Sequence, residues 1–234
     1  MTDEGDHHDH HRDVASGGAR AAVFGMSDGL VTNTSLILGF AGAHPSATVV
    51  RLAGLAGLVA GACSMAIGEL ISMQAQRELL EYELGVERHA LAHAPQEERA
   101  ELEALYVRKG LSAGLAAQLA TEVMANPELA LEVHAREELG VDPGQLGSPT
   151  KAALASLVMF SLGAFLPLLP WLFLHGSVAV VTSVVLAAVG SVALGGVLGH
   201  FTGRSKVTSA LRQLGLTAVA AAITSGIGHL VGAG

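Results

Sequence analysis

The chain has 234 residues, of which 50% are hydrophobic and only 15% are charged, and its formal net charge is -8. A soluble domain usually has about a quarter charged residues, so this composition argues against a soluble globular protein. The negative charge argues against nucleic acid as a partner and suits a surface that attracts cations. The single cysteine, Cys63, excludes a disulfide framework and a cysteine-based zinc site.

Charged residues are rare or absent in five long apolar stretches. Asp28 is the only charged residue between positions 21 and 50, Glu69 is the only one between 52 and 76, and 152–203 and 213–234 have none. A helix needs about 20 apolar residues to cross the hydrocarbon core of a bilayer. We therefore predict an all-α, polytopic membrane protein with five transmembrane helices, at 21–43, 50–74, 152–173, 177–200 and 209–231.

The first 20 residues are polar, and four histidines alternate there with acidic residues: His7, His8, His10 and His11. We predict a disordered tail that either binds metal weakly through imidazole and carboxylate or is simply solvated. A basic segment followed by a short apolar one with a cleavage site is not seen, so we expect no cleaved signal peptide.

The first predicted span contains one carboxylate, Asp28, followed closely by a polar run from Thr32 to Ser35. An ionisable group inside a membrane costs on the order of 3 kcal/mol or more, so it is by default a candidate for function. The alternative is that Asp28 lies near the interface and caps or hydrates a helix end. We favour function, because the neighbouring span also carries a carboxylate.

The second predicted span continues without Gly or Pro from position 69 to 84 into an acidic, soluble sequence. Helical spacing places five of its side chains on one face: Met65, Glu69, Ser72, Met73 and Gln76. Each methionine alone is more often core filling, and Glu69 alone could be an interfacial carboxylate paired with another helix. The shared face favours a path for a cation.

Residues 75–150 form a polar, glutamate-rich module, for which Pro and Gly positions predict helices at 75–94, 96–108, 112–125 and 128–139. Most of these glutamates are expected to form solvated faces. Three pairs share a helical face: Glu83 with Glu87, Glu98 with Glu101, and His134 with Glu138. Carboxylates from several helices, joined by one imidazole, suit Fe2+, Mn2+ or Zn2+.

The last three spans contain two features that bear on packing. Pro167 and Pro170 are expected to break or kink the third span, and the adjacent Trp171 suits the membrane interface. Gly195 and Gly199 in the fourth span are spaced for close contact between helices. The spacing leaves open whether that contact is within one subunit or between two.

The orientation follows from the distribution of Lys and Arg. All but one of the 13 fall on the side of the N-terminus and the module, and the exception is Arg51. Because positive residues stay in the cytoplasm, we predict that the N-terminus and the module are cytoplasmic and that the C-terminus is outside. The predicted organisation is a tail (1–20), transmembrane helices 1 and 2 (21–74), a cytoplasmic metal-binding module (75–150) and transmembrane helices 3 to 5 (151–234).

Four segments together resemble the vacuolar iron transporter family, in a bacterial form. They are MSDGLVTNTSLILGFAGA in span one, GACSMAIGELISMQAQRE in span two, the acidic insertion ending HAREELG, and FLPLLP in span three. The resemblance runs from about position 21 to the C-terminus. It implies dimeric divalent-metal/proton antiporters that move Fe2+, and often Mn2+, out of the cytoplasm, with a cytoplasmic helical domain that binds metal through glutamates.

Site residues can be carried over from this resemblance only where the motifs match. In the membrane, Asp28 and Met65 would contact metal, and Glu69 would serve conduction or proton coupling. The module's matching ligand positions are Glu87, Glu98, Glu101 and Glu138. His134 stands where plant-type members tend to have Met, and Ala90 where another acid is expected, so the number of bound ions and the preference for Fe2+ stay open.

Residue pattern and resemblance together predict an exporter of Fe2+ and Mn2+, with Zn2+ or Co2+ as further ions, for metal homeostasis. We expect proton antiport, a homodimer, the bacterial inner (plasma) membrane as its location, and no resident cofactor. The alternative is a membrane-anchored metal buffer or sensor that transports nothing. An enzyme ranks last, since no nucleophile–base pair, phosphate loop or zinc-protease motif occurs.

Overall fold

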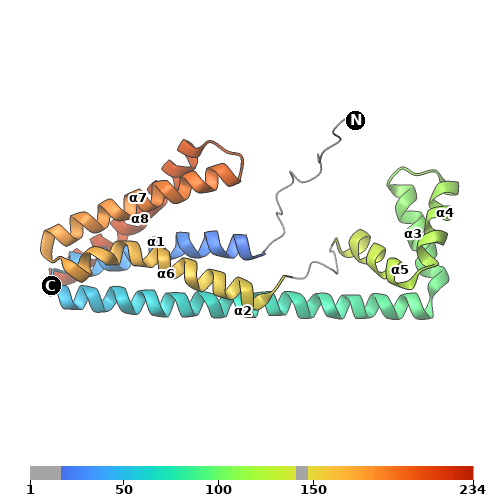
Figure 1. Cartoon of the computed structure of the whole chain (residues 1–234), viewed down its shortest axis with the longest axis horizontal. Helices are drawn as coiled ribbons and strands as arrows, with labels where there is room; N and C mark the ends of the chain where they lie inside the picture. The colour runs from blue at the N-terminus through green and yellow to red at the C-terminus, as the bar shows by residue number, and fades with distance from the viewer. Residues whose placement is uncertain (1–16, 141–146, 234) are drawn as a thin grey trace, which may run out of the picture. The chain divides into compact units, whose positions relative to one another are not determined.

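A computed structural model describes residues 17–140 and 147–233, and all regular structure in these residues is helical. The helices are α1 (Gly17–Gly42), α2 (Ala47–His93), α3 (Pro95–Arg108), α4 (Ala113–Met124), α5 (Pro127–His134), the π-helical turn η1 (Ala135–Leu139), α6 (Pro149–Phe173), α7 (Gly176–Phe201) and α8 (Lys206–Gly232) (Figure 1). The predicted tail lies, up to residue 16, outside the described residues.

The chain divides into two compact units. The membrane unit takes the described residues up to Ile71 and those from Ser148 onward, and the helical module takes Ser72 to Gly147. The boundary falls inside α2, which has no break in its 47 residues.

Within residues 17–140 and 147–233, five helices are long and apolar enough to cross a membrane: α1, α2, α6, α7 and α8. They coincide with the five predicted spans, and each observed helix extends beyond the predicted apolar core at one or both ends. The all-helical, multi-pass prediction is therefore confirmed. The helices α1, α6 and α7 are the most buried of the five, whereas α8 is the least.

Three of these helices run in the same direction. Asn33 in α1 donates a hydrogen bond to the Ala164 carbonyl in α6, and Gln213 in α8 donates one to Ser27 in α1. About two turns earlier in both α1 and α6, Gly25 lies against Ser156, and later in both α1 and α8, Gly42 lies against Ser225. This order makes α1, α6 and α8 parallel, as a chain with five crossings requires.

Glycines allow the backbones of neighbouring helices to come close. A Cβ at Gly25 would lie 2.8 Å from the Ser156 carbonyl oxygen of α6, and one at Gly195 would lie 2.6 Å from the Ser209 carbonyl oxygen of α8. A Cβ at Gly199 would lie 2.8 Å from the Cα of Lys206. The small-residue pattern at Gly195 and Gly199 therefore serves contact within one chain, which the sequence left open.

The end of α6 differs from expectation in two ways. The helix continues through Pro167 and Pro170 to Phe173, so neither proline breaks it. Ser183 of α7 donates a 2.7 Å hydrogen bond to the Pro167 carbonyl, which ties this part of the helix to its neighbour. Trp171, which the sequence suggested for the membrane interface, has its side chain buried in a core cluster with Ile37 and Leu168.

Local sequence explains where the module's helices begin and end. Pro95 and Pro127 each occupy the first turn of a helix, where the missing N–H is tolerated, and the Asn126 side chain accepts from the backbone N–H groups of Glu128 and Leu129. Gly110 and Gly140 have positive φ and terminate the segments before them. The predicted helix 128–139 is in fact two elements, α5 and the π turn η1.

A small apolar core joins the helices of the module. It consists of Leu102 from α3, Ala120 and Val123 from α4, and Ala130 from α5, with Leu91 of α2 packed against it. This core fixes how α2, α3, α4 and α5 face one another, and hence which of their polar side chains meet.

Candidate metal centre

One cluster of potential metal ligands stands out in the module. Glu87 of α2, Glu98 in the first turn of α3 and His134 at the end of α5 bring one ligand atom each to within 4.8 Å of one another. Among the described residues, no other group of three His, Cys, Asp or Glu side chains meets this spacing. The three residues lie on three different helices, so the core of the module assembles them.

Glu98 and His134 are buried and Glu87 is half-buried, and several of their polar atoms lack a hydrogen-bond partner. His134 is 0% exposed and Glu98 is 9% exposed. Nδ1 of His134 lies 3.4 Å from Oε1 of Glu87, beyond a good hydrogen bond. Both imidazole nitrogens of His134 and this Glu87 oxygen have no hydrogen-bond partner in the described protein. Buried polar atoms normally have partners, so these three atoms are available to a ligand.

The surroundings of Glu87 and Glu98 disfavour a negative charge. Burial raises the pKa of Glu87 to about 7, with further contributions from the carboxylates of Glu138, Glu98 and Glu101. Burial also raises the pKa of Glu98, followed by repulsion from Glu101 and Glu138. Like charges gathered without a counterion raise carboxyl pKa values in this way, and a divalent cation would relieve the repulsion.

His134 is held neutral. Burial lowers its pKa, although the nearby carboxylates of Glu138 and Glu101 act in the opposite direction. The close approach of His134 to Glu87 is therefore a contact between a neutral imidazole and a carboxyl group rather than an ion pair. A neutral imidazole has a free lone pair, which is the form that binds metal.

The donor set fits a borderline divalent cation. Two carboxylates and one imidazole suit Fe2+, Mn2+ or Zn2+ better than Ca2+, which prefers oxygen alone. The other two predicted ligands of the module, Glu101 and Glu138, are exposed and do not belong to the close cluster. They lie near enough for their charges to raise the pKa of Glu87.

The π turn η1 follows His134 directly and contains Glu138. Such turns hold an extra residue per turn and are frequent at functional sites. Lys109 forms an ion pair with Glu137 of the same turn, so one of the two adjacent carboxylates is neutralised. Glu138 remains close to the cluster, where it adds negative charge without being buried.

The membrane residues predicted to handle metal lie on two helices, α1 and α2. Asp28 is half-buried in α1 and accepts a 3.1 Å hydrogen bond from the Thr32 hydroxyl. Met65 of α2 packs against the buried cluster of Phe160, Ala62 and Ala164, and Glu69 lies one turn further along, half-buried. Their predicted roles in the membrane stay predictions.

The polar run after Asp28 separates into two environments. Thr32 is exposed and serves Asp28, whereas Asn33, Thr34 and Ser35 are buried among the helices. Sequence reasoning also missed the hydrogen bonds that join Gln213 to Ser27 and Ser191 to Thr217 between membrane helices. The signal was present as isolated polar residues at helical spacing, Gln213 and Thr217, in an apolar span.

Comparison with known proteins gives a consistent match over nearly the whole chain. The sequence profile of the VIT family matches residues 19–229. The chain is 30% identical to vacuolar iron transporter 1 of Arabidopsis thaliana over 218 residues, which cover 93% of this chain and 87% of the relative. It is 34% identical to a vacuolar iron transporter of Acanthamoeba castellanii over 221 residues, covering 92% and 79% respectively.

Proposed function

The chain belongs to the VIT family, and on this premise we propose that it carries divalent iron across a membrane, with Mn2+ as a second cargo. The relatives named as vacuolar iron transporters support metal transport as the activity. The family consists of transporters, so we propose a transporter rather than an enzyme.

The observation that carries this proposal is the close set of Glu87, Glu98 and His134, in which Oε1 of Glu87 and both ring nitrogens of His134 have no hydrogen-bond partner among the described residues. Leaving such buried atoms without partners costs stability, so we propose that the set is retained for a ligand. In the proposal the module captures Fe2+ from the cytoplasm at this centre. The exposed carboxylates of Glu101 and Glu138 raise the local concentration of cations around it.

The route through the bilayer is proposed to use Asp28, Met65 and Glu69. A carboxylate inside a membrane span is costly and rare, and a thioether beside carboxylates favours a transition metal over Ca2+ or Mg2+. Protons that enter from the opposite side would protonate the carboxylates and so release the metal. This coupling makes the protein an antiporter that exports metal from the cytoplasm.

We further propose the orientation, location and assembly that the sequence predicts. The asymmetry of Lys and Arg supports a cytoplasmic N-terminus and module with the C-terminus outside. The bacterial inner membrane and a homodimer rest on the family resemblance alone; the relatives compared above come from a plant and an amoeba. Topology mapping with reporter fusions after Phe173 and after Phe201 tests the orientation directly.

A membrane-anchored metal buffer or sensor is the second candidate, because the module is a compact unit that contains the whole close cluster. Uptake of Fe2+ into proteoliposomes, with and without a pH gradient, separates the two functions. A transporter shows flux that depends on the gradient and is lost in Asp28→Ala and Glu69→Gln. Metal binding without any flux in the unmodified protein would leave only the buffer.

A further inference from the structure

The end of α2 carries two histidines that the buried centre does not use. His89 and His93 are both exposed, and their i, i+4 spacing places them on one helical face. Their rings are stacked, with centroids 3.9 Å apart and planes 14° apart. Glu87 lies only two positions before His89 and therefore faces another direction, so this pair is distinct from the buried centre.

The hydrogen bond of His93 prepares one of its nitrogens for a metal ion. Nδ1 of His93 lies 2.8 Å from the carbonyl oxygen of His89. A carbonyl can only accept, so Nδ1 carries the proton and the Nε2 of the neutral ring presents its lone pair. Histidines that bind metals commonly donate their other N–H to a backbone carbonyl in this way, which fixes both tautomer and orientation.

The two stacked rings have to turn before they can share an ion. The lone pair of an imidazole nitrogen lies in the plane of its ring, so two nearly parallel rings aim their lone pairs side by side and not at one point. Both side chains are exposed and can rotate about their side-chain torsions, which lets one nitrogen of each converge on an ion at about 2.0–2.1 Å. Both residues also lie in the last turns of α2, where free carbonyl groups favour a cation.

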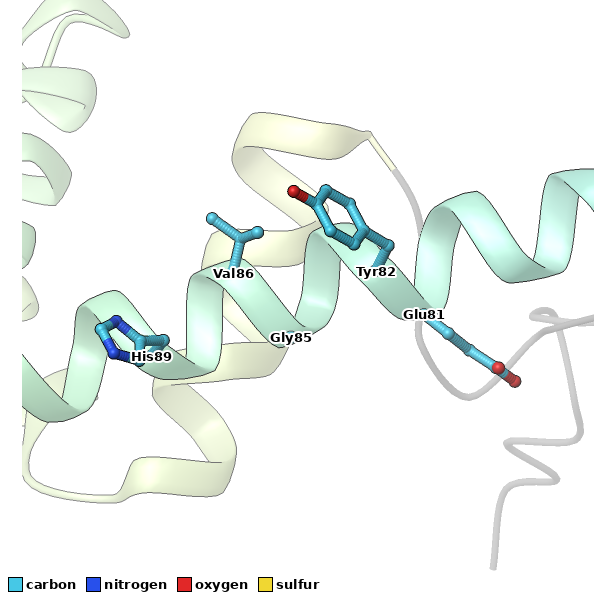
Figure 2. A pocket seen from close by; sticks show the side chains of 5 residues that line it. All are labelled: Glu81, Tyr82, Gly85, Val86 and His89. Atoms are coloured by element: carbon cyan, nitrogen blue, oxygen red, sulfur yellow. The ribbon is translucent and has the colours of Figure 1, made fainter.

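The neighbouring surface leaves the rest of the coordination sphere to water. A shallow groove on α2 is lined by Glu81, Tyr82, Gly85, Val86 and His89 (Figure 2). Figure 2 shows that Glu81 points away from Val86 and His89. The Glu81 carboxylate is instead paired with Arg77 at 2.8 Å. A bound ion would therefore be held by two imidazoles and remain open to exchange.

We infer that His89 and His93 form a second, solvent-exposed metal site, which chelates borderline divalent ions such as Zn2+ and Cu2+ through two imidazole nitrogens. Pairs of histidines at i, i+4 on a helix are a known arrangement for zinc. Imidazole suits Zn2+ and Cu2+ and is a poor match for Mn2+. This inference stands on the geometry of α2 and does not depend on the proposed transport.

The test uses the full chain in detergent, with the other candidate imidazole sites removed. His7, His8, His10 and His11 are replaced by Gln, and His134 by Met, so that neither the tail nor the buried centre contributes an imidazole. One equivalent of Cu2+ is added and its electron paramagnetic resonance spectrum is recorded. We expect hyperfine splitting from two nitrogens, since Cu2+ binds such ligands most strongly of the first-row ions.

Substitutions then identify which histidines supply the two nitrogens that bind Cu2+. His89→Gln and His93→Gln are each expected to weaken Cu2+ binding at least about tenfold, and the double variant no further, because a chelate is lost with either ligand. The control replaces the other paired rings, His44 and His229, which stand edge to face with centroids 5.6 Å apart. A two-nitrogen signal that survives removal of His89 and His93, or that disappears in the control, overturns the inference.

Discussion

Both units bury polar side chains, but the two sets differ in charge and in their hydrogen bonds. In the membrane unit, Asn33 and Gln213 are neutral, and each donates one hydrogen bond to another helix, at 2.6 Å and 2.9 Å. In the module, Glu87, Glu98 and His134 are ionisable and come from three helices without bonding to one another. The first group joins helices, whereas in the second Oε1 of Glu87 and both ring nitrogens of His134 have no hydrogen-bond partner among the described residues.

The difference shows how to separate packing from ligand binding among buried polar groups. The membrane unit also has unpartnered atoms, such as Oδ1 of Asn33 and Oγ of Ser156, but these belong to neutral side chains. Burying a neutral polar group without a hydrogen-bond partner costs about 1–3 kcal/mol, whereas burying a charge without a counterion costs more and shifts the pKa of the group. An ionisable group without a partner therefore indicates a missing ion more strongly than a neutral group does.

The largest expected effect follows from removing the carboxylates of the module. The double substitution Glu87→Gln and Glu98→Gln takes two anionic ligands from the cluster, so Fe2+ or Zn2+ affinity at this centre should fall at least about 100-fold. Isothermal titration calorimetry with the tail histidines replaced measures it. Glu81→Gln is the matched control, since this exposed carboxylate lies outside the cluster and pairs with Arg77. Equal losses in both variants would contradict a specific centre.

Proton competition gives the next largest effect. Metal binding displaces the proton of Glu87, whose pKa is about 7, so affinity should rise with pH by up to about tenfold per unit between pH 5 and 7 and level off above it. Burial lowers the pKa of His134, which moves proton competition at this imidazole to lower pH. Titrations at pH 5.5, 6.5 and 7.5 test this. An affinity that does not change with pH would mean that Glu87 is no ligand.

Glu87→Gln should weaken metal binding but stabilise the metal-free module. The pKa of Glu87 is higher in the folded protein than its ordinary value of 4.5, so its stabilising contribution is complete below about pH 4.5 and is lost as the pH rises through 7. Gln resembles the protonated acid. Glu87→Gln should therefore stabilise the metal-free module by about 1–2 kcal/mol at pH 8 and leave it unchanged near pH 4.5.

Differential scanning calorimetry of the metal-free protein at these two pH values measures the change. A destabilised variant at pH 8 would show that Glu87 is held by favourable contacts within the protein, and the contrast between the two units would then disappear.

The smallest expected effect concerns the membrane unit. Gln213→Ala removes the hydrogen bond to Ser27 and should lower stability by about 0.5–2 kcal/mol, equally at pH 5 and pH 8, without changing metal affinity. Thr182→Ala is the control, because this exposed hydroxyl bonds only to the carbonyl of Val178 in its own helix. A loss in Gln213→Ala that depends on pH would show that this network handles protons rather than joining helices.

The sequence predicts the helices well because their signals are local. The gaps between charged residues locate the five membrane helices, and Pro95, Pro127 and Gly140 mark ends in the module within a few residues. The π turn after His134 escapes prediction, since an extra residue in a turn depends on contacts elsewhere in the fold. The burial of Trp171 escapes for the same reason.

The candidate site is predicted as a set of residue types but not as a geometry. Helical spacing predicts that Glu98 and Glu101 share a face of their helix. In the structure only Glu98 is buried, and Glu101 is exposed. Which face of α3 turns inward is decided by Leu102 in the apolar core, together with residues from two other helices. The spacing of residues along one helix does not predict the distances between side chains on different helices.

The positions of the aromatic residues give the two units separate optical signals. Trp171, the only tryptophan, is buried in the membrane unit, whereas both tyrosines, Tyr82 and Tyr106, belong to the module. Tryptophan fluorescence therefore reports on the packing of the membrane helices alone. Quenching of tyrosine by a bound transition metal reports on the module, so the two halves of the protein can be followed at the same time without a label.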